Sequence, residues 1–124
     1  MKIKEFVQEI RGQLTAEQCA AARRASAFFL GISAPRKSSH SLAGWEVDQG
    51  LFLALLGGVD IPPSLWRGQG WSRASRAREW AEENLLPTLG EQYPRTKADV
   101  EDLLHYHSLE GHLVEFARWL YHNS

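Results

Sequence analysis

The chain has 124 residues, of which 44% are hydrophobic and 23% are charged, and its formal net charge at pH 7 is −1. A chain of this length and composition forms one domain with enough apolar surface for a core, which excludes wholesale disorder. The nearly neutral balance also argues against a dedicated nucleic-acid binder, because such domains usually have a pI above about 9.

The sequence lacks the patterns typical of secretion or membrane insertion. Its N-terminus, MKIKEFVQEIRGQL, mixes charged and apolar residues, and its longest dense apolar run, Leu51 to Leu56, is far too short to cross a bilayer. The single cysteine, Cys19, excludes an intramolecular disulfide and a thiolate metal cluster within one chain. We therefore expect a cytoplasmic protein that makes no contact with a membrane.

The first two helices are indicated by spacing and by capping residues. Apolar residues at helical spacing predict a helix within residues 2–14. Thr15 and Gln18 have the spacing of a capping box, which predicts a second helix over residues 16–30. This helix is rich in alanine, whose small side chain lets a neighbouring helix approach closely. Gly31 is placed to end it.

A polar loop and a third helix follow. Residues 32–41 contain Pro35 and a cluster of serines, which is typical of a loop. Leucine and alanine favour a helix over residues 42–56, although the run of residues 51–56 also has the length of a short buried strand. The pair Gly57-Gly58 ends this element.

The second half of the chain carries further helix boundaries. Ser72 has the place of an N-cap for a helix that runs to about Leu86, where the following proline disfavours helical geometry. Thr96 with Asp99 marks the start of another helix. Ser108 interrupts the chain before a last helix with a clear apolar stripe.

These elements predict an all-α fold. The sequence shows no internal repeat, no heptad run long enough for a coiled coil and no linker that would divide the chain. We therefore predict a single compact, bundle-like helical domain of five or six helices that covers residues 1–124.

Residues 64–78, SLWRGQGWSRASRAR, differ from the rest of the chain and are called the Trp/Arg segment below. They place two tryptophans among four arginines, without an acidic residue. Tryptophan and arginine are enriched in the hot spots of protein interfaces. We therefore predict a binding surface here, with Trp71 as the anchor and with Arg73 and Arg76 pairing with acidic groups. The predicted binding residues are Trp66, Arg67, Trp71, Arg73 and Arg76.

Two other interpretations of the Trp/Arg segment stay open. In a nucleic-acid complex, Arg67, Arg73 and Arg76 would contact phosphates while Trp71 stacks on an exposed base. In the other interpretation, Trp66 and Trp71 fill the core and the arginines form a solvated helix face. Three glutamates that follow on the same predicted helix favour a protein partner over a phosphate backbone. Exposure of the tryptophans distinguishes a binding surface from a core.

The histidines give little support to a metal site or to catalysis. His105 and His107 are two residues apart, so they point away from each other on a helix. His107 and His112 lie on either side of the predicted break, whereas His112 and Glu115 have a spacing that puts them on one face. A metal-dependent enzyme using His107, His112 and Glu115 is therefore a remote third class. No GxSxG motif occurs, and Cys19 on its alanine-rich helix is expected to be a small buried residue. We expect no catalysis, no metal and no cofactor.

The last two predicted helices do not form a DNA reader. Glu110 and Glu115 would face the phosphate backbone in a helix-turn-helix arrangement, which is repulsive. Phe116, Trp119 and Tyr121 cover more than one face of the last helix, so part of this apolar surface is expected to stay exposed for a partner, including a second copy in a homodimer.

The sequence thus favours a non-catalytic protein-binding module. We expect it to act as an inhibitor, a regulator or adaptor, or a small subunit of a larger macromolecular complex; a bacterial, phage- or plasmid-type inhibitor of a host complex has this size. The alternative is a nucleic-acid-binding protein, or a subunit of a nucleoprotein complex, that uses residues 66–78.

Overall fold

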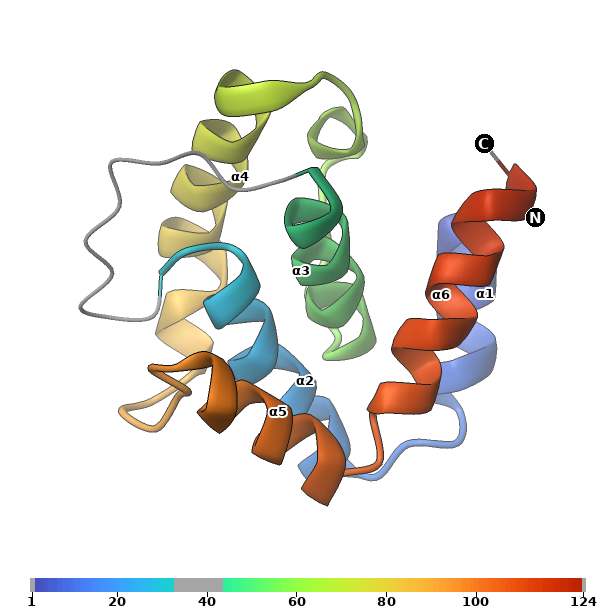
Figure 1. Cartoon of the computed structure of the whole chain (residues 1–124), viewed down its shortest axis with the longest axis vertical. Coiled ribbons are helices and arrows are strands. Elements are labelled where there is room, and N and C mark those ends of the chain that lie inside the picture. The colour runs from blue at the N-terminus through green and yellow to red at the C-terminus, as the bar shows by residue number, and fades with distance from the viewer. Residues whose placement is uncertain (1, 33–43, 124) are drawn as a thin grey trace.

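Six α-helices form most of the chain that the computed structural model describes, which is residues 2–32 and 44–123 (Figure 1). No strand occurs in these two stretches, so the all-α prediction is confirmed and residues 51–56 are helical. The elements in chain order are α1 (Ile3–Arg11), α2 (Ala16–Phe29), α3 (Gly44–Leu56), the 3-10 turn η1 (Pro63–Trp66), α4 (Gly70–Asn84), the 3-10 turn η2 (Leu86–Thr88), α5 (Lys97–Tyr106) and α6 (Glu110–Asn123).

The central layer of the fold is the pair α2 and α3, and Figure 1 shows α3 between α4 and α6. Every residue of α3 from Gly50 to Leu56 is buried. The face of α2 that meets α3 is built from small side chains, and the buried Ser26 hydroxyl donates a 2.6 Å hydrogen bond to the Gly50 carbonyl. Small residues at this contact let the two backbones approach closely.

Two of the three helix starts predicted from capping residues are present, those at Thr15 and Thr96. Thr15 and Thr96 each cap a helix with a complete capping box, α2 with Gln18 and α5 with Asp99. The predicted interruption at Ser108 is a turn with a positive φ of 56° between α5 and α6. The predicted loop 32–41 and the first two residues of the predicted third helix lie almost entirely outside the described residues.

Aromatic rings attach α6 to the rest of the domain. The Phe116 ring stacks on the Phe52 ring of α3 at a centroid distance of 4.3 Å, and the Trp119 ring stacks on the Phe6 ring of α1 at 5.8 Å. Trp66 in η1 meets Phe116 edge to face at 6.4 Å. This aromatic cluster, Phe6, Phe52, Trp66, Phe116 and Trp119, therefore joins four elements that are distant in sequence.

The described helices are also informative about membranes. None of those within residues 2–32 and 44–123 combines the length and the apolar character that crossing a bilayer requires.

Candidate functional site

The Trp/Arg segment enters α4 through a turn made of two glycines with positive φ. Gly68 has φ +92° and Gly70 has φ +68°, a backbone region that other residues rarely adopt. The helix begins at Gly70 with Gln69 as its N-cap, so the prediction that Ser72 caps the helix is wrong. Because glycine can turn the chain so sharply, the helix starts before the first residue with a capping side chain. Trp71 consequently lies in the first turn of α4.

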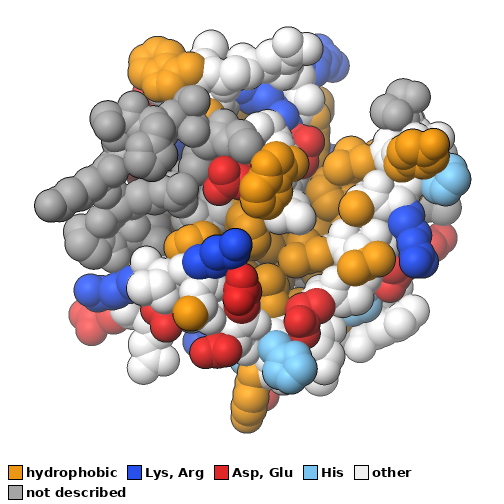
Figure 2. Space-filling view, in the orientation of Figure 1, with side chains coloured by type: hydrophobic (Ala, Val, Ile, Leu, Met, Phe, Trp, Pro, Cys, Tyr) orange, Lys and Arg blue, Asp and Glu red, His pale blue; other side chains and the backbone are white. Residues whose placement is uncertain are grey.

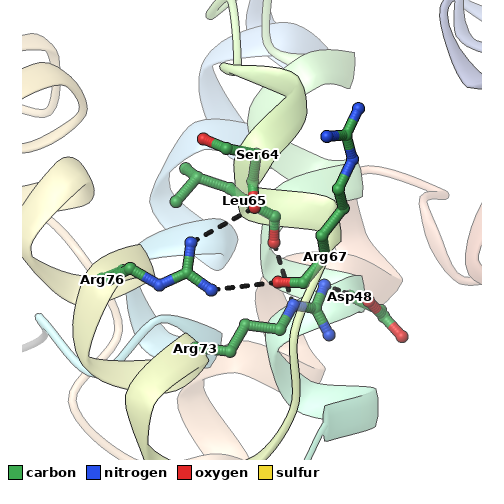
Figure 3. A network of polar contacts seen from close by, with 6 residues as sticks. All are labelled: Asp48, Ser64, Leu65, Arg67, Arg73 and Arg76. Carbon is green, nitrogen blue, oxygen red and sulfur yellow. Dashed lines mark hydrogen bonds and ion pairs between the residues drawn. The ribbon is translucent and has the colours of Figure 1, made fainter.

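Arg73 is part of the interior of the domain. It is only 6% exposed, and its Nε donates a 2.9 Å hydrogen bond to the Leu65 carbonyl. Its Nη2 forms an ion pair with Asp48 Oδ1 of α3, as the dashed lines in Figure 3 show. A guanidinium that is buried and already paired cannot serve a partner. We therefore correct the predicted binding set by removing Arg73.

Arg76 lies one turn further along α4 and is exposed, but it also holds the segment in place. Its Nη1 and Nη2 donate to the carbonyls of Ser64 and Arg67, at 3.3 Å and 3.0 Å. The Arg67 side chain is exposed and points away from this network in Figure 3. Arg73 and Arg76 thus both attach residues 64–67 to α4, while the Arg67 side chain remains directed to solvent.

The two tryptophans of the segment have different environments. Trp66 is half-buried and its ring contacts Phe116, so it belongs to the edge of the core. Trp71 is 70% exposed. The question that the sequence left open therefore has a separate answer for each tryptophan, and Trp71 is the one available to a partner.

The positive charge of the segment is smaller than its composition indicates. The charge of Arg73 is balanced by Asp48, and Arg78 is half-buried. Arg67 and Arg76 remain as exposed cations, four residues before and five residues after Trp71 in the sequence. Three exposed glutamates follow on α4: Glu79, Glu82 and Glu83. The Trp71 surface is defined here as Arg67, Trp71 and Arg76, the exposed members of the predicted binding set.

The sequence analysis missed a second exposed tryptophan and the groove beside it. Trp45, in the first turn of α3, is 61% exposed. It borders a groove of about 420 Å³ whose floor comes from α2, α3 and α5. Its lining residues are Phe28, Phe29, Trp45, Glu46, Gln49, Lys97, Val100, Glu101 and Leu104. A tryptophan followed directly by a glutamate near the start of the predicted helix is the sequence signal that could have drawn attention to it.

Two of the histidines each lie beside a single glutamate. His105 Nδ1 lies 3.0 Å from Glu110 Oε1 at the surface, and His112 Nδ1 lies 3.4 Å from Glu115 Oε1. Within the described part of the chain, no group of three or more histidine, cysteine, aspartate or glutamate side chains is arranged to hold a metal ion. Cys19 on α2 is a half-buried free thiol, more exposed than we expected.

The fold and this site define a helical domain with two exposed tryptophans, of which Trp71 lies in the Trp/Arg segment. Compared with family models, curated proteins and solved structures, the chain has no match in any of the three.

Proposed function

We propose that this chain is a non-catalytic protein-binding module that docks on its partner through the Trp71 surface. In this role it acts in the cytoplasm as an inhibitor, a regulator or a small subunit of a larger complex. The observation that carries the proposal is the 70% exposure of Trp71 within the segment that is rich in tryptophan and arginine. A tryptophan in water gains free energy when a partner covers it, and such residues dominate interface hot spots.

The segment that leads to Trp71 is hydrogen-bonded to side chains of α4, which favours tight binding. Arg73 ties α4 to Leu65 and to Asp48, and Arg76 ties it to the two carbonyls on the other side of the turn. Ordering a flexible loop at an interface costs binding free energy. A turn that is already ordered in the free protein avoids that cost, so more of the contact energy of Trp71 appears as affinity.

The surroundings of Trp71 favour an acidic partner surface. Arg67 and Arg76 are exposed cations on either side of it in sequence. The N-cap of α4, Gln69, makes no side-chain hydrogen bond to the helix, and the first turn has no acidic residue. The positive end of the helix dipole is therefore not compensated locally and adds to the attraction for carboxylates. We expect a partner with an apolar pocket for the indole ring and acidic side chains at its rim.

A nucleic-acid partner is supported less well. Single-strand binders combine stacking aromatics with a basic groove that follows the backbone. Here Arg73, one of the predicted phosphate contacts, is buried against Asp48. The exposed glutamates further along α4 would repel phosphates. What remains is too short a basic track to follow a strand.

The test is capture of partners from cells that naturally contain the protein, with the wild type, Trp71→Ala and the matched control Trp45→Ala as baits, each with and without nuclease. We expect Trp71→Ala to weaken binding of the captured protein by about 2 kcal/mol or more, which is about 30-fold in Kd. The thermal melting curve of this variant should stay close to that of the wild type, because Trp71 packs little against the domain. Trp45→Ala should bind as the wild type does.

Two results would contradict the proposal. If Trp71→Ala captures and binds the partner with wild-type affinity, the Trp71 surface is not the docking site. If nuclease abolishes capture and a single-stranded oligonucleotide binds with a steep salt dependence, the nucleic-acid alternative holds instead.

A further inference from the structure

Helix α6 has a second apolar stripe, on the side opposite to the one that Phe116 buries. Val114 is 52% exposed and Tyr121 is 80% exposed, with the exposed Ala117 between them. Their spacing of three and four residues puts them on one face of the helix. Two exposed charged residues border this stripe: Glu110 lies at its N-terminal end, and Arg118 lies beside it.

The stripe is accessible. In Figure 1, α6 lies at the edge of the molecule with α1 behind it. Figure 2 shows hydrophobic side chains along the side of α6 that faces the viewer, interrupted by a basic group. The Trp71 surface belongs to the start of α4, on the other side of α3 in Figure 1. A partner on α6 therefore does not compete with a partner on Trp71.

We propose that this α6 face, residues 110–121, binds the same face of a second copy of the chain in an antiparallel helix pair. The order of charges along α6 favours a second copy as the partner and an antiparallel orientation of the two helices. Glu110 stands at one end and Arg118 near the other. In a parallel pair, Glu110 would face Glu110 of the second copy and Arg118 would face Arg118, so both contacts would be repulsive. In an antiparallel pair, Glu110 of each copy comes near Arg118 of the other, so two attractive contacts form by symmetry.

The apolar residues fit the same arrangement. The positions 110, 114, 117 and 121 follow the alternating spacing of four and three that forms the seam of paired helices. With antiparallel alignment, Val114 packs against Ala117 of the second copy, and Tyr121 lies over its Glu110. Gly111, beside Glu110, has no other atom near the place of a Cβ, which leaves room for the long Arg118 side chain.

The expected dimer is weak, because one helix face of three to four turns is smaller than a standard interface. Glu110 already accepts from His105 within its own chain through one oxygen, and its other oxygen remains for the arginine. We expect a dissociation constant on the order of 10–100 μM, as is common for small interfaces. The dimer would double the number of Trp71 surfaces, which strengthens binding to any partner with two sites.

Sedimentation velocity over a range of protein concentrations tests the proposal. The variants are Glu110→Arg, Arg118→Glu and the double exchange of both residues, with Glu83→Arg on α4 as a control that changes the net charge without touching α6. We expect each single variant to raise the dissociation constant at least about tenfold, because like charges then meet across the pair. The double exchange restores opposite charges and should return the dissociation constant close to that of the wild type.

A wild-type protein that stays monomeric at about 1 mM would overturn the proposal. So would a dimer that the single variants leave intact, or a double exchange that fails to restore it. Val114→Glu provides a second check, because it puts a carboxylate on the apolar seam of an exposed helix face without changing the core. Trp71→Ala should leave the dimer unchanged, so a failure here is distinguishable from a failure of the proposed function.

Discussion

Arg73 and Arg76 lie three residues apart on α4, but Arg73 is buried and Arg76 is exposed, so their roles differ. Arg73 is enclosed and neutralised by Asp48, so its contribution is to stability. Arg76 keeps its charge in contact with water while it bonds to the backbone of the preceding turn. Residue type alone does not separate these roles, since the distinction depends on where Asp48 of α3 lies.

The first prediction concerns the Arg73–Asp48 pair. Arg73→Ala leaves the Asp48 carboxylate part-buried without its cation and leaves the Leu65 carbonyl without its donor. Breaking such a pair from one side costs about 3 kcal/mol. We therefore expect the free energy of unfolding in urea to fall by about this amount.

The controls for this prediction are the exposed Arg67 and an apolar replacement of the pair. Arg67→Ala should change the stability by less than about 0.5 kcal/mol, as is usual at exposed positions. The double variant Arg73→Met with Asp48→Leu should recover part of the loss, because it removes both charges together. A stability of Arg73→Ala equal to that of the wild type would show that the ion pair is not structural.

At the scale of elements, α3 packs closely against the end of α2 at Gly50. Glycine inside a helix costs about 1 kcal/mol relative to alanine, which made Gly50 an unfavourable residue for the predicted third helix. Its surroundings explain its presence. A Cβ at Gly50 would come within 2.6 Å of the fully buried Leu30 side chain, so the side chain or a helix would have to shift. The missing side chain lets the two helices meet and lets Ser26 reach the Gly50 carbonyl.

The second prediction follows from this close packing. Gly50→Ala should lower the free energy of unfolding by about 1–2 kcal/mol, because the overpacking exceeds the gain in helix propensity. The matched control is Gly111→Ala on α6, where a Cβ would meet nothing within 4 Å. In dilute protein, that control should be neutral or should stabilise the domain by up to about 1 kcal/mol. Equal effects of the two substitutions would mean that the α2–α3 contact is not tight.

At the scale of the whole molecule, the aromatic cluster joins the first described helix, α1, to the last, α6. It brings α1 from the N-terminal end against α6 from the C-terminal end, with α3 and η1 completing the contact. Phe116 is the centre of this arrangement, since its ring contacts both Phe52 and Trp66. Loss of one ring should therefore affect the attachment of the entire last helix.

The third prediction is that Phe116→Ala lowers the free energy of unfolding by about 3–5 kcal/mol, the usual cost of removing a buried phenylalanine. Hydrogen exchange should show the largest loss of protection in α6, because that helix depends most on the cluster. Tyr106→Ala, at an exposed position, serves as the control and should leave both measurements nearly unchanged. Unchanged protection of α6 in Phe116→Ala would show that other contacts hold the helix.

The sequence predicted the elements well, and the reason is that their signals are local. Both capping boxes, at Thr15 and at Thr96, depend on residues three positions apart, so they could be recognised without the fold. The start of α4 was wrong because two glycines with positive φ let the helix begin at Gly70, ahead of Ser72. Such a turn depends on backbone geometry that carries no polar side-chain signal.

The sequence by itself thus determined the all-α class, most helix boundaries and the presence of a distinctive Trp/Arg segment. Only the tertiary structure decided which members of that segment face a partner. Trp66 lies at the edge of the core because Phe116, fifty residues later, packs against it. Arg73 is buried because it forms an ion pair with Asp48. Trp71 is 70% exposed, because among residues 2–32 and 44–123 no element packs over the first turn of α4 where it lies. Apolar spacing indicates which face of a helix is buried, but whether a tryptophan or an arginine in a connecting segment is buried depends on contacts with distant residues.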